Sequence, residues 1–351
     1  MKRIGLLTGG GDCPGLNAVI RAVTKTAIFQ HQAEVIGILD GYAGLVAEQF
    51  YPLTVNEVTS ILTRGGTILG TSNKCDPFDK KNDRSKEAAA FVEKLGLDGL
   101  IVIGGDGTQT SALKFFKMGL PIVSVPKTID NDLPGTDITF GFDSALSVAT
   151  EAIDRLHTTG ESHKRVMVLE VMGRNAGWIA LRSGIAGGGD VILIPEIPYQ
   201  MERVCASIQA RSKRGRNFSI VVVAEGAKPK GGERVIARID PTSPDPIRLG
   251  GIGNQVAEQI EEATGLESRA TVLGHLQRGG TPTPYDRWLA TRFGVHAVEL
   301  VQKKKFGQMV SLRGTQITSI PLKEAVSGLR LVDPNGDEVL TAKSVGTCFG
   351  D

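Results

Sequence analysis

Two short segments combine bare backbone with side chains that suit phosphate chemistry. The first is Gly104-Gly105-Asp106-Gly107-Thr108, which follows the apolar run at residues 100–103. Glycines leave backbone N–H groups open to phosphate oxygens, and a carboxylate beside them can hold a divalent metal. The segment therefore predicts a site for a phosphate chain with a metal on Asp106. The simpler alternative is an aspartate that only caps the next helix.

The second segment places two carboxylates beside a cation and a hydroxyl. It is Lys127-Thr128-Ile129-Asp130-Asn131-Asp132, after the apolar run at residues 121–125. In an extended chain, alternation puts Asp130 and Asp132 on the same side. Phosphoryl transfer to an alcohol needs a base at the hydroxyl and neutralisation of phosphate charge. The segment predicts such acceptor chemistry, although Asn and Asp also favour plain turns.

A third glycine-rich segment lies near the start of the chain, at residues 9–15 (GGGDCPG), between a strand-like run and a helical pattern. This position predicts anion binding at a helix N-terminus. The segment is neither a Walker A motif, which requires Gly-Lys-Ser/Thr, nor a clean G-x-G-x-x-G. A tight turn between strand and helix is therefore the alternative.

Several arginines and one histidine sit near strand ends or glycine-rich turns: Arg165, Arg174, Arg269, His275 and Arg278. Arginine suits bidentate phosphate recognition and transition-state charge. A single arginine more often forms a surface ion pair, but His275 with Arg278 three residues on predicts contact with a substrate phosphate or hydroxyl. The other histidines lack metal-ligand spacing, which argues against structural zinc. The basic residues 211–216 are better explained as a solvated helix end than as a regulatory anion site.

The elements that must position these residues alternate along the chain. Strands are predicted at 3–8, 34–39, 99–103, 121–125, 165–171, 191–195 and 219–225, and helices at 16–29, 86–95, 111–116, 145–158, 201–211 and 253–264. This alternation predicts an α/β fold with mainly parallel strands and helices on both faces. Ligands in such folds bind at the carboxyl ends of the strands. Residues 228–246 predict a surface excursion, with a turn at 240–246.

Composition restricts the class of protein. The 351 residues are 41% apolar and 22% charged, with a net charge of +2, so a soluble globular protein of two lobes is expected. The near-neutral charge argues against nucleic-acid binding, and no apolar run is long enough to span a membrane. Glycine, at 44 residues, is above its usual share. Four scattered cysteines and a start without a signal-peptide pattern predict a cytoplasmic location.

Five motifs, in this order, closely resemble the 6-phosphofructokinase family. They are GGGDCPG (9–15), GGDGT (104–108), PKTIDND (126–132), MGR (172–174) and the signature from Arg269 to Arg287 that contains GHLQRGG. The resemblance implies two Rossmann-like lobes with the active site in the cleft between them. It implies an ATP-binding lobe of residues 1–141 plus about 276–325. Residues from about 142 to 275 plus 326–351 would bind fructose 6-phosphate.

The resemblance also implies a reaction and its residues. Mg-ATP would phosphorylate the 1-hydroxyl of D-fructose 6-phosphate, with Asp130 as the base, Thr128 holding the transferring phosphoryl group and Arg174 assisting catalysis. The nucleotide would contact Gly11, Asn73, Lys74, Gly105, Asp106, Gly107 and Thr108, and Asp106 would serve Mg²⁺. The sugar phosphate would contact Thr128, Ile129, Asp130, Asp132, Arg165, Met172, Gly173, Arg174, Glu225, Arg269, His275, Leu276, Gln277 and Arg278.

The family is commonly tetrameric, and Arg165 and Arg269 would reach the site of a neighbouring subunit, so at least a homodimer is expected. Two departures from the family pattern have consequences. Asn73 and Lys74 stand where ATP-dependent members usually have a phosphate-binding arginine. Val55 and His157 replace effector-site arginines, although Arg21 and Lys25 keep basic character, so strong regulation by ADP or phosphoenolpyruvate is not expected.

Donor identity depends on two positions. Gly107 leaves room for the α-phosphate and nucleoside of ATP, where pyrophosphate-dependent members have an aspartate that excludes them. Lys127 is typical of pyrophosphate users. Steric exclusion is harder to overcome than an extra cation, so ATP is the predicted donor. The alternatives are pyrophosphate, a non-catalytic regulator that binds nucleotide or sugar phosphate, and a lipid or NAD kinase.

Overall fold

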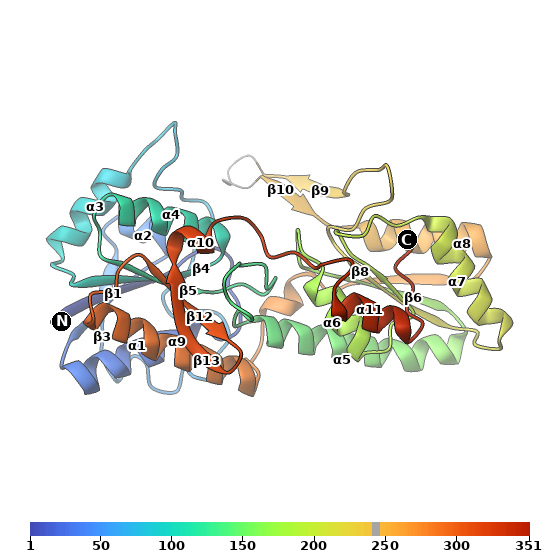
Figure 1. Ribbon diagram of the computed structural model, residues 1–351, viewed down its shortest axis with the longest axis horizontal. Helices are drawn as coiled ribbons and strands as arrows, with labels where there is room; N and C mark the ends of the chain where they lie inside the picture. The colour runs from blue at the N-terminus through green and yellow to red at the C-terminus, as the bar shows by residue number, and fades with distance from the viewer. Residues whose placement is uncertain (241–245) are drawn as a thin grey trace.

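Apolar runs rich in Val, Ile and Leu form the central strands of two separate sheets. The computed structural model describes residues 1–240 and 246–351, so most of the turn expected at 240–246 lies outside the described residues. Figure 1 shows one sheet with its helices on the left, near the N-terminus, and the other on the right. The predicted α/β class with mainly parallel sheets is confirmed.

The first sheet has seven strands in the order β13-β12-β5-β4-β1-β2-β3. Its strands are β1 (Arg3–Thr8), β2 (Glu34–Ile38), β3 (Phe50–Leu53), β4 (Gly99–Gly104), β5 (Ile122–Pro126), β12 (Gln308–Arg313) and β13 (Gln316–Pro321). The five inner strands are parallel, and only the edge strands β3 and β13 run antiparallel to their neighbours. The strand at 308–313 therefore returns to a sheet begun by residues 3–8.

Helices cover both faces of this sheet: α1 (Leu16–His31), α2 (Tyr42–Val46), α3 (Ser85–Lys94), α4 (Asp106–Lys117), α9 (Pro284–Gln302) and α10 (Leu322–Ala325). Alternate strand residues enter different cores. Ile101 and Ile103 pack on the side of α1 and α9, whereas Leu100 and Val102 pack on the side of α3 and α4. Burial on both faces explains why these strands are apolar without alternation.

The second sheet has four parallel strands in the order β11-β6-β8-β7. Its strands are β6 (Val166–Val171), β7 (Val191–Leu193), β8 (Ser219–Ala224) and β11 (Ser268–Val272). Its helices are α5 (Phe142–His163), α6 (Trp178–Ala186), α7 (Met201–Lys213), α8 (Ile252–Thr264) and α11 (Asp337–Ser344). A separate hairpin of β9 (Ile236–Ile239) and β10 (Ile247–Leu249) and the short 3-10 helix η1 (Gly274–Arg278) complete the described elements.

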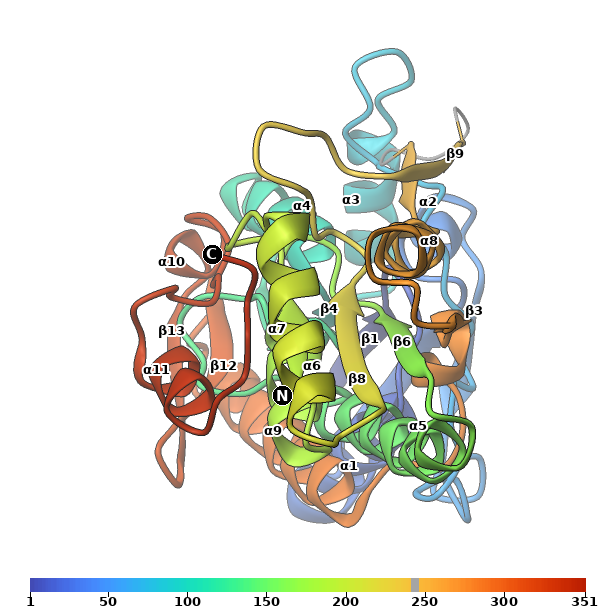
Figure 2. The ribbon, with the colours of Figure 1, turned by 90° about the vertical axis from the view of Figure 1, so that its right-hand side faces the viewer.

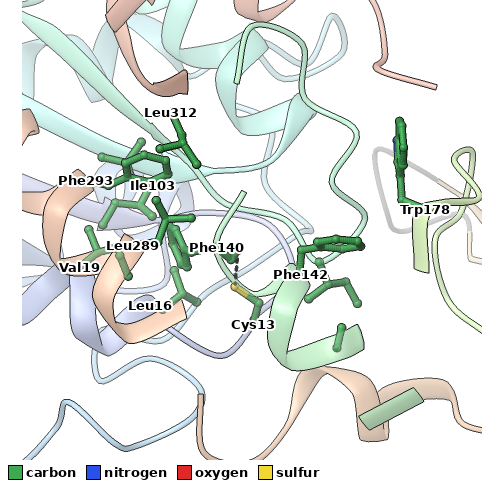
Figure 3. Packing of buried hydrophobic residues seen from close by; sticks show 14 of the residues in the cluster. Cys13, Leu16, Val19, Ile103, Phe140, Phe142, Trp178, Leu289, Phe293 and Leu312 are labelled. Atoms are coloured by element: carbon green, nitrogen blue, oxygen red, sulfur yellow. Dashed lines mark hydrogen bonds between the residues drawn. The ribbon is translucent and has the colours of Figure 1, made fainter. Parts of the chain in front are cut away.

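The two groups of elements share one continuous core. Figure 3 shows Leu289 and Phe293 of α9 packed near Phe140, with Phe142 of α5 farther along toward the second sheet. The buried Cys13 thiol donates a hydrogen bond to the Phe140 carbonyl at 3.8 Å. Viewed along the long axis in Figure 2, α5 and α9 lie on the same side of the molecule. The start of α5 therefore joins the two halves.

Two local expectations were wrong. The helix expected from residue 111 begins five residues earlier, at Asp106, because the glycine-rich segment itself supplies the first turn. The acidic segment is not extended, because Asn131 has a left-handed backbone with a φ of 54°. Among the described residues, no helix is long and apolar enough to cross a membrane.

Candidate active site

The carboxyl ends of the strands of both sheets open into one cleft of about 910 Å³. Segments after β1, β4 and β5 line it from the first half, and segments after β6 and β8 line it from the second. Because parallel strands end at the same edge, motifs far apart in the sequence meet here. This edge is the position that the strand–helix alternation predicts for a ligand.

Most residues predicted for the site line this cleft. They are Gly11, Asn73, Gly105, Asp106, Gly107, Thr108, Lys127, Thr128, Ile129, Asp130, Asp132, Met172, Arg174, Glu225, His275 and Arg278. Six predicted residues do not line it: Lys74, Gly173, Arg165, Arg269, Leu276 and Gln277.

Helix α4 directs its N-terminus into the cleft. Asp106, Gly107 and Thr108 form its first turn, so their backbone N–H groups are free of helix partners and face an anion site. A Cβ atom placed on Gly107 would meet nothing within 4 Å. The position is therefore open space, large enough for a ligand or for a longer side chain. Partial burial raises the pKa of Asp106.

Lys127 connects the two glycine-rich turns. Its backbone N–H donates to Gly104 O at 3.0 Å, and its ammonium donates to the Gly11 carbonyl. Burial lowers the pKa of this lysine. A Cβ atom on Gly11 would lie 1.8 Å from the Arg278 guanidinium. A side chain at position 11 would therefore displace the Arg278 guanidinium from its present position in the cleft.

The acidic segment, residues 127–132, is held by hydrogen bonds to residues close to it in the sequence. The Asp130 N–H donates to Thr128 Oγ1 at 3.0 Å, and Asn131 Oδ1 accepts from the Thr139 N–H at 3.0 Å. The buried Asp130 Oδ1 has no hydrogen-bond partner among the described residues. Burial raises the pKa of Asp130, against the lowering effect of Arg278, Lys127 and Arg174. Burial, with Asp130 nearby, raises the pKa of Asp132 to about 7.

The second half contributes a buried acid, Glu225, and an arginine, Arg174. Glu225, at the end of β8, accepts a hydrogen bond from the Arg174 N–H at 3.1 Å. Burial, and then Asp130, raises the pKa of Glu225 to about 7. Four carboxyls in one cleft, Asp106, Asp130, Asp132 and Glu225, each have a raised pKa, which indicates a functional site rather than a solvated acidic face.

The predicted residues outside the cleft have structural partners in this chain. Gln277 is buried and joins Met172 N (3.3 Å) to Gly274 O (3.1 Å), whereas Leu276 is 68% exposed. Arg165 pairs with Glu267 at 2.7 Å, and Arg269 pairs with the same carboxylate. His157 contacts the Gly187 carbonyl at 2.6 Å through its ring Nε2.

Several cleft residues were not predicted from the sequence. They include Tyr42, Asp76 and Lys114 around α4, Asn175 after the MGR motif, Leu329 near the C-terminus, and five residues of the β9–β10 hairpin. Tyr42 donates to Thr108 O at 2.9 Å. None of these positions belongs to a motif, and only the tertiary fold brings them to the cleft.

The predicted magnesium site would rest on one carboxylate, Asp106, rather than on a cluster of ligands. Among the described residues, no group of three or more His, Cys, Asp or Glu side chains is arranged to hold an ion. Mg²⁺ commonly keeps several waters and uses one or two carboxylates with substrate phosphates. Asp106, at the N-terminus of α4 and in the lining of the cleft, fits that pattern.

Comparison with known proteins gives consistent matches along the chain. Residues 3–301 match the family described as phosphofructokinase. An "ATP-dependent 6-phosphofructokinase" of Chloroflexus aurantiacus is 56% identical over 358 residues, which cover 100% of this chain and 98% of that protein. A "Pyrophosphate--fructose 6-phosphate 1-phosphotransferase" of Streptomyces coelicolor is 51% identical over 349 residues, which cover 99% of this chain and 100% of that protein. Similar relatives are therefore named for two different phosphoryl donors.

The fold comparison agrees with the sequence comparison. The solved phosphofructokinase of Saccharomyces cerevisiae matches with a TM-score of 0.81 and 34% identity. The match covers 93% of this chain and 45% of the yeast chain.

Proposed function

This chain belongs to the phosphofructokinase family, as the order of its five motifs predicted, and we propose that it phosphorylates fructose 6-phosphate with ATP. The products are fructose 1,6-bisphosphate and ADP. The observation that supports this most directly is the meeting of the α4 N-terminus and the acidic segment in one cleft. A phosphate chain bound at the α4 N-terminus would face the carboxyl base of the acidic segment.

The acceptor is activated by Asp130. Its carboxylate takes the proton of the sugar 1-hydroxyl as that oxygen bonds to the γ-phosphorus, and the bond from that phosphorus to the bridging oxygen of ADP breaks. Thr128 and Arg174 stabilise the phosphoryl group in the transition state of the transfer. Ile129, Asp132, Met172, Glu225, His275 and Arg278 hold the sugar phosphate from the lining of the cleft. Gly173, Leu276 and Gln277, which do not line the cleft, support Met172 and His275 from neighbouring positions.

The donor lies along the glycine-rich turns. Gly11, Asn73, Lys74, Gly105 and Thr108 contact its phosphates, and the open space at Gly107 admits the α-phosphate and nucleoside. Lys127 donates to Gly11 O, so its charge lies beside the donor turn without filling the space at Gly107. This arrangement favours ATP over pyrophosphate even though relatives named for either donor are similar to this chain.

Magnesium is the metal that the site would use. Asp106 would hold it, together with phosphate oxygens of the donor. The ion would supply neutralisation of the charge that accumulates on those oxygens.

The proposed domains are residues 1–141 with about 276–325, and about 142–275 with 326–351. Support comes from β12 and β13, which extend the first sheet. On the other side, the backbone of Cys348 forms a parallel β-bridge with Val191 of β7 in the second sheet. We place the protein in the cytoplasm, since ATP is a substrate there and all four cysteines are free.

A donor comparison tests the proposal. Purified protein is assayed with fructose 6-phosphate and Mg²⁺, with ATP or pyrophosphate as donor, and the expected kcat/KM is higher with ATP. The Gly107→Asp variant, whose side chain enters open space, should fold and lose ATP activity preferentially. Higher kcat/KM with pyrophosphate would overturn the donor assignment, and no turnover with either donor would overturn the proposed function.

A further inference from the structure

The β9–β10 hairpin presents two arginines to the cleft from opposite strands. Arg238 on β9 pairs directly with Arg248 on β10 in the antiparallel register, and both line the cleft. Directly opposed side chains on a ribbon lie about 5 Å apart at Cβ, and like charges there destabilise the pair. Asp240 lies 3.7 Å from Arg248, so one carboxylate of the same hairpin is close to this arginine.

The base of the hairpin is fixed to the site itself. Arg234 donates to Asn175 Oδ1 at 2.6 Å, next to the MGR motif. On the return side, Gly251 and Gly253 donate backbone N–H groups to Glu170 at the end of β6, at 2.8–3.1 Å. Figure 1 shows the ribbon leaving the second sheet and extending toward the first half of the molecule. The opposed arginines are therefore held over the cleft between the two halves.

The charged side chains of the cleft indicate what these two arginines could bind. Six acidic side chains line the cleft, and only four lysines and arginines outside the hairpin do so. Both substrates of the proposed reaction are polyanions, so each further cation in the cleft favours their binding. Arg238 and Arg248 raise the basic side chains to six. Guanidinium groups bind phosphate with paired, charge-assisted hydrogen bonds.

We propose that Arg238 and Arg248 bind a phosphate group of a bound substrate across the cleft, an inference that rests on the proposed function. The bound phosphate relieves the repulsion between the two guanidinium groups. The hairpin thereby adds a phosphate-binding pair from outside the five sequence motifs. The chemistry suits either the phosphate chain of the donor or the 6-phosphate of the sugar.

Steady-state kinetics separate these sources. Arg238→Ala, Arg248→Ala and the double variant are assayed with ATP varied at saturating fructose 6-phosphate, and then the reverse. We expect the KM for one substrate to rise about tenfold or more in each single variant. A rise for ATP assigns the donor phosphates, and a rise for fructose 6-phosphate assigns the sugar phosphate. The Lys variants, which keep the charge, should recover part of the loss.

The matched control is Arg216→Ala, an exposed arginine of the same half that does not line the cleft. Its KM values should equal those of the wild type. If the wild type turns over but the double variant keeps both KM values, the inference fails while the proposed function stands. A wild type without turnover contradicts the proposed function instead.

Discussion

Burial and neighbouring cations act on the Asp130 carboxyl in opposite directions. Burial raises its pKa, whereas Arg278, Lys127 and Arg174 lower it. A base must be ionised before it takes a proton, so these three cations favour the catalytic form of the residue. The buried Asp130 Oδ1 has no hydrogen-bond partner in the described chain, and Asp130 lines the cleft where the acceptor would bind.

We predict that Asp130→Asn lowers kcat by about 10²–10⁴, because the amide keeps the shape of the side chain but cannot accept the proton. In the wild type, kcat/KM should fall as the pH is lowered through the raised pKa of Asp130, since protonated Asp130 is inactive. Asp154→Asn, an exposed site on α5, serves as the control. A loss of less than about tenfold in Asp130→Asn would remove the residue from the role of base.

At this scale, the sequence identifies residue types better than contacts. The motifs predicted Asp106, Asp130 and Arg174, and these residues do meet in one cleft. The contact between Gly11 and Arg278 could not be predicted, because it joins motifs more than two hundred and fifty residues apart. The bend at Asn131 was missed because a left-handed asparagine depends on the Thr139 hydrogen bond to its side chain.

The start of α5 is held by a carboxylate from another helix. Asp286, in the first turn of α9, accepts hydrogen bonds from Ser144 N (2.8 Å) and Ser144 Oγ (2.6 Å). Thr283 returns a hydrogen bond to Asp143 at 2.5 Å. A carboxylate at a helix N-terminus is favoured by the free N–H groups there. These contacts fix the two halves of the molecule near the acidic segment.

We predict a pH-dependent contribution of Asp286 to stability. Burial raises its pKa from 3.8 to about 6. Between those values the folded protein holds a proton that the unfolded chain has lost. The contribution is therefore full below about pH 4 and decreases as pH rises through about 6, by roughly 3 kcal/mol.

Urea unfolding of wild type and Asp286→Asn at about pH 4.5 and about pH 7.5 measures this change. The wild-type free energy of unfolding should decrease relative to the variant at the higher pH. Asp154→Asn should give no such difference. Parallel pH dependence of wild type and Asp286→Asn would show that Asp286 does not titrate in this window.

A segment between α10 and α11 supports the acidic segment from outside the motifs. The Arg330 N–H donates to Asp132 O at 2.7 Å, and its guanidinium donates to Asn131 O at 3.3 Å. That guanidinium also lies 4.5 Å from the centroid of the Trp178 ring, whose Nε1 donates to Arg330 O. Arg330 therefore joins the acidic segment to α6 of the second half.

We predict that Arg330→Ala lowers kcat by about tenfold with a smaller change in the KM for ATP, because Asp130 loses its fixed position while the donor turns are untouched. Arg330→Lys should recover part of kcat by keeping the cation over Trp178. Lys343→Ala is the matched control, since it removes a cation 5.7 Å from the Phe349 ring in the same C-terminal region. Equal loss of kcat in both Ala variants would indicate a general stability effect instead.

Elements with strong local patterns were predictable, and those defined by distant partners were not. Buried strands such as β4 and β8 are short apolar runs, which the sequence marks clearly. The return of β12 beside β5 depends on pairing across about 180 residues, which no local pattern records. The sequence did not predict the start of α4 at Asp106, because glycine has a low helix propensity and Gly107 lies in the first turn.

At the scale of the whole molecule, the predicted phosphate ligands Arg165 and Arg269 lie near the amino ends of their strands, opposite to the edge that forms this chain's cleft. Arg165 precedes β6, whereas Met172, which lines the cleft, follows it. Six residues of strand separate them by about 20 Å. Arg269 lies beside Arg165, and both pair with Glu267. Neither guanidinium can serve this cleft, so their proposed role requires a second subunit.

Mixing two inactive variants tests whether the site is shared between subunits. Asp130→Asn should remove the base of its own site but still supply Arg269 to a partner, whereas Arg269→Ala should keep its base and lack the partner contribution. A hybrid dimer would contain one intact site, and random assortment would restore about a quarter of wild-type activity in the mixture. Co-expression with two affinity tags isolates the hybrid for assay, and each variant co-expressed with its own tagged copy is the control. Since Arg269 is exposed and its loss leaves Glu267 paired with Arg165, the variant should fold. Activity no greater than the sum of the two parents would place every required residue within one chain, and Arg269 would then have only its ion pairs with Glu261 and Glu267.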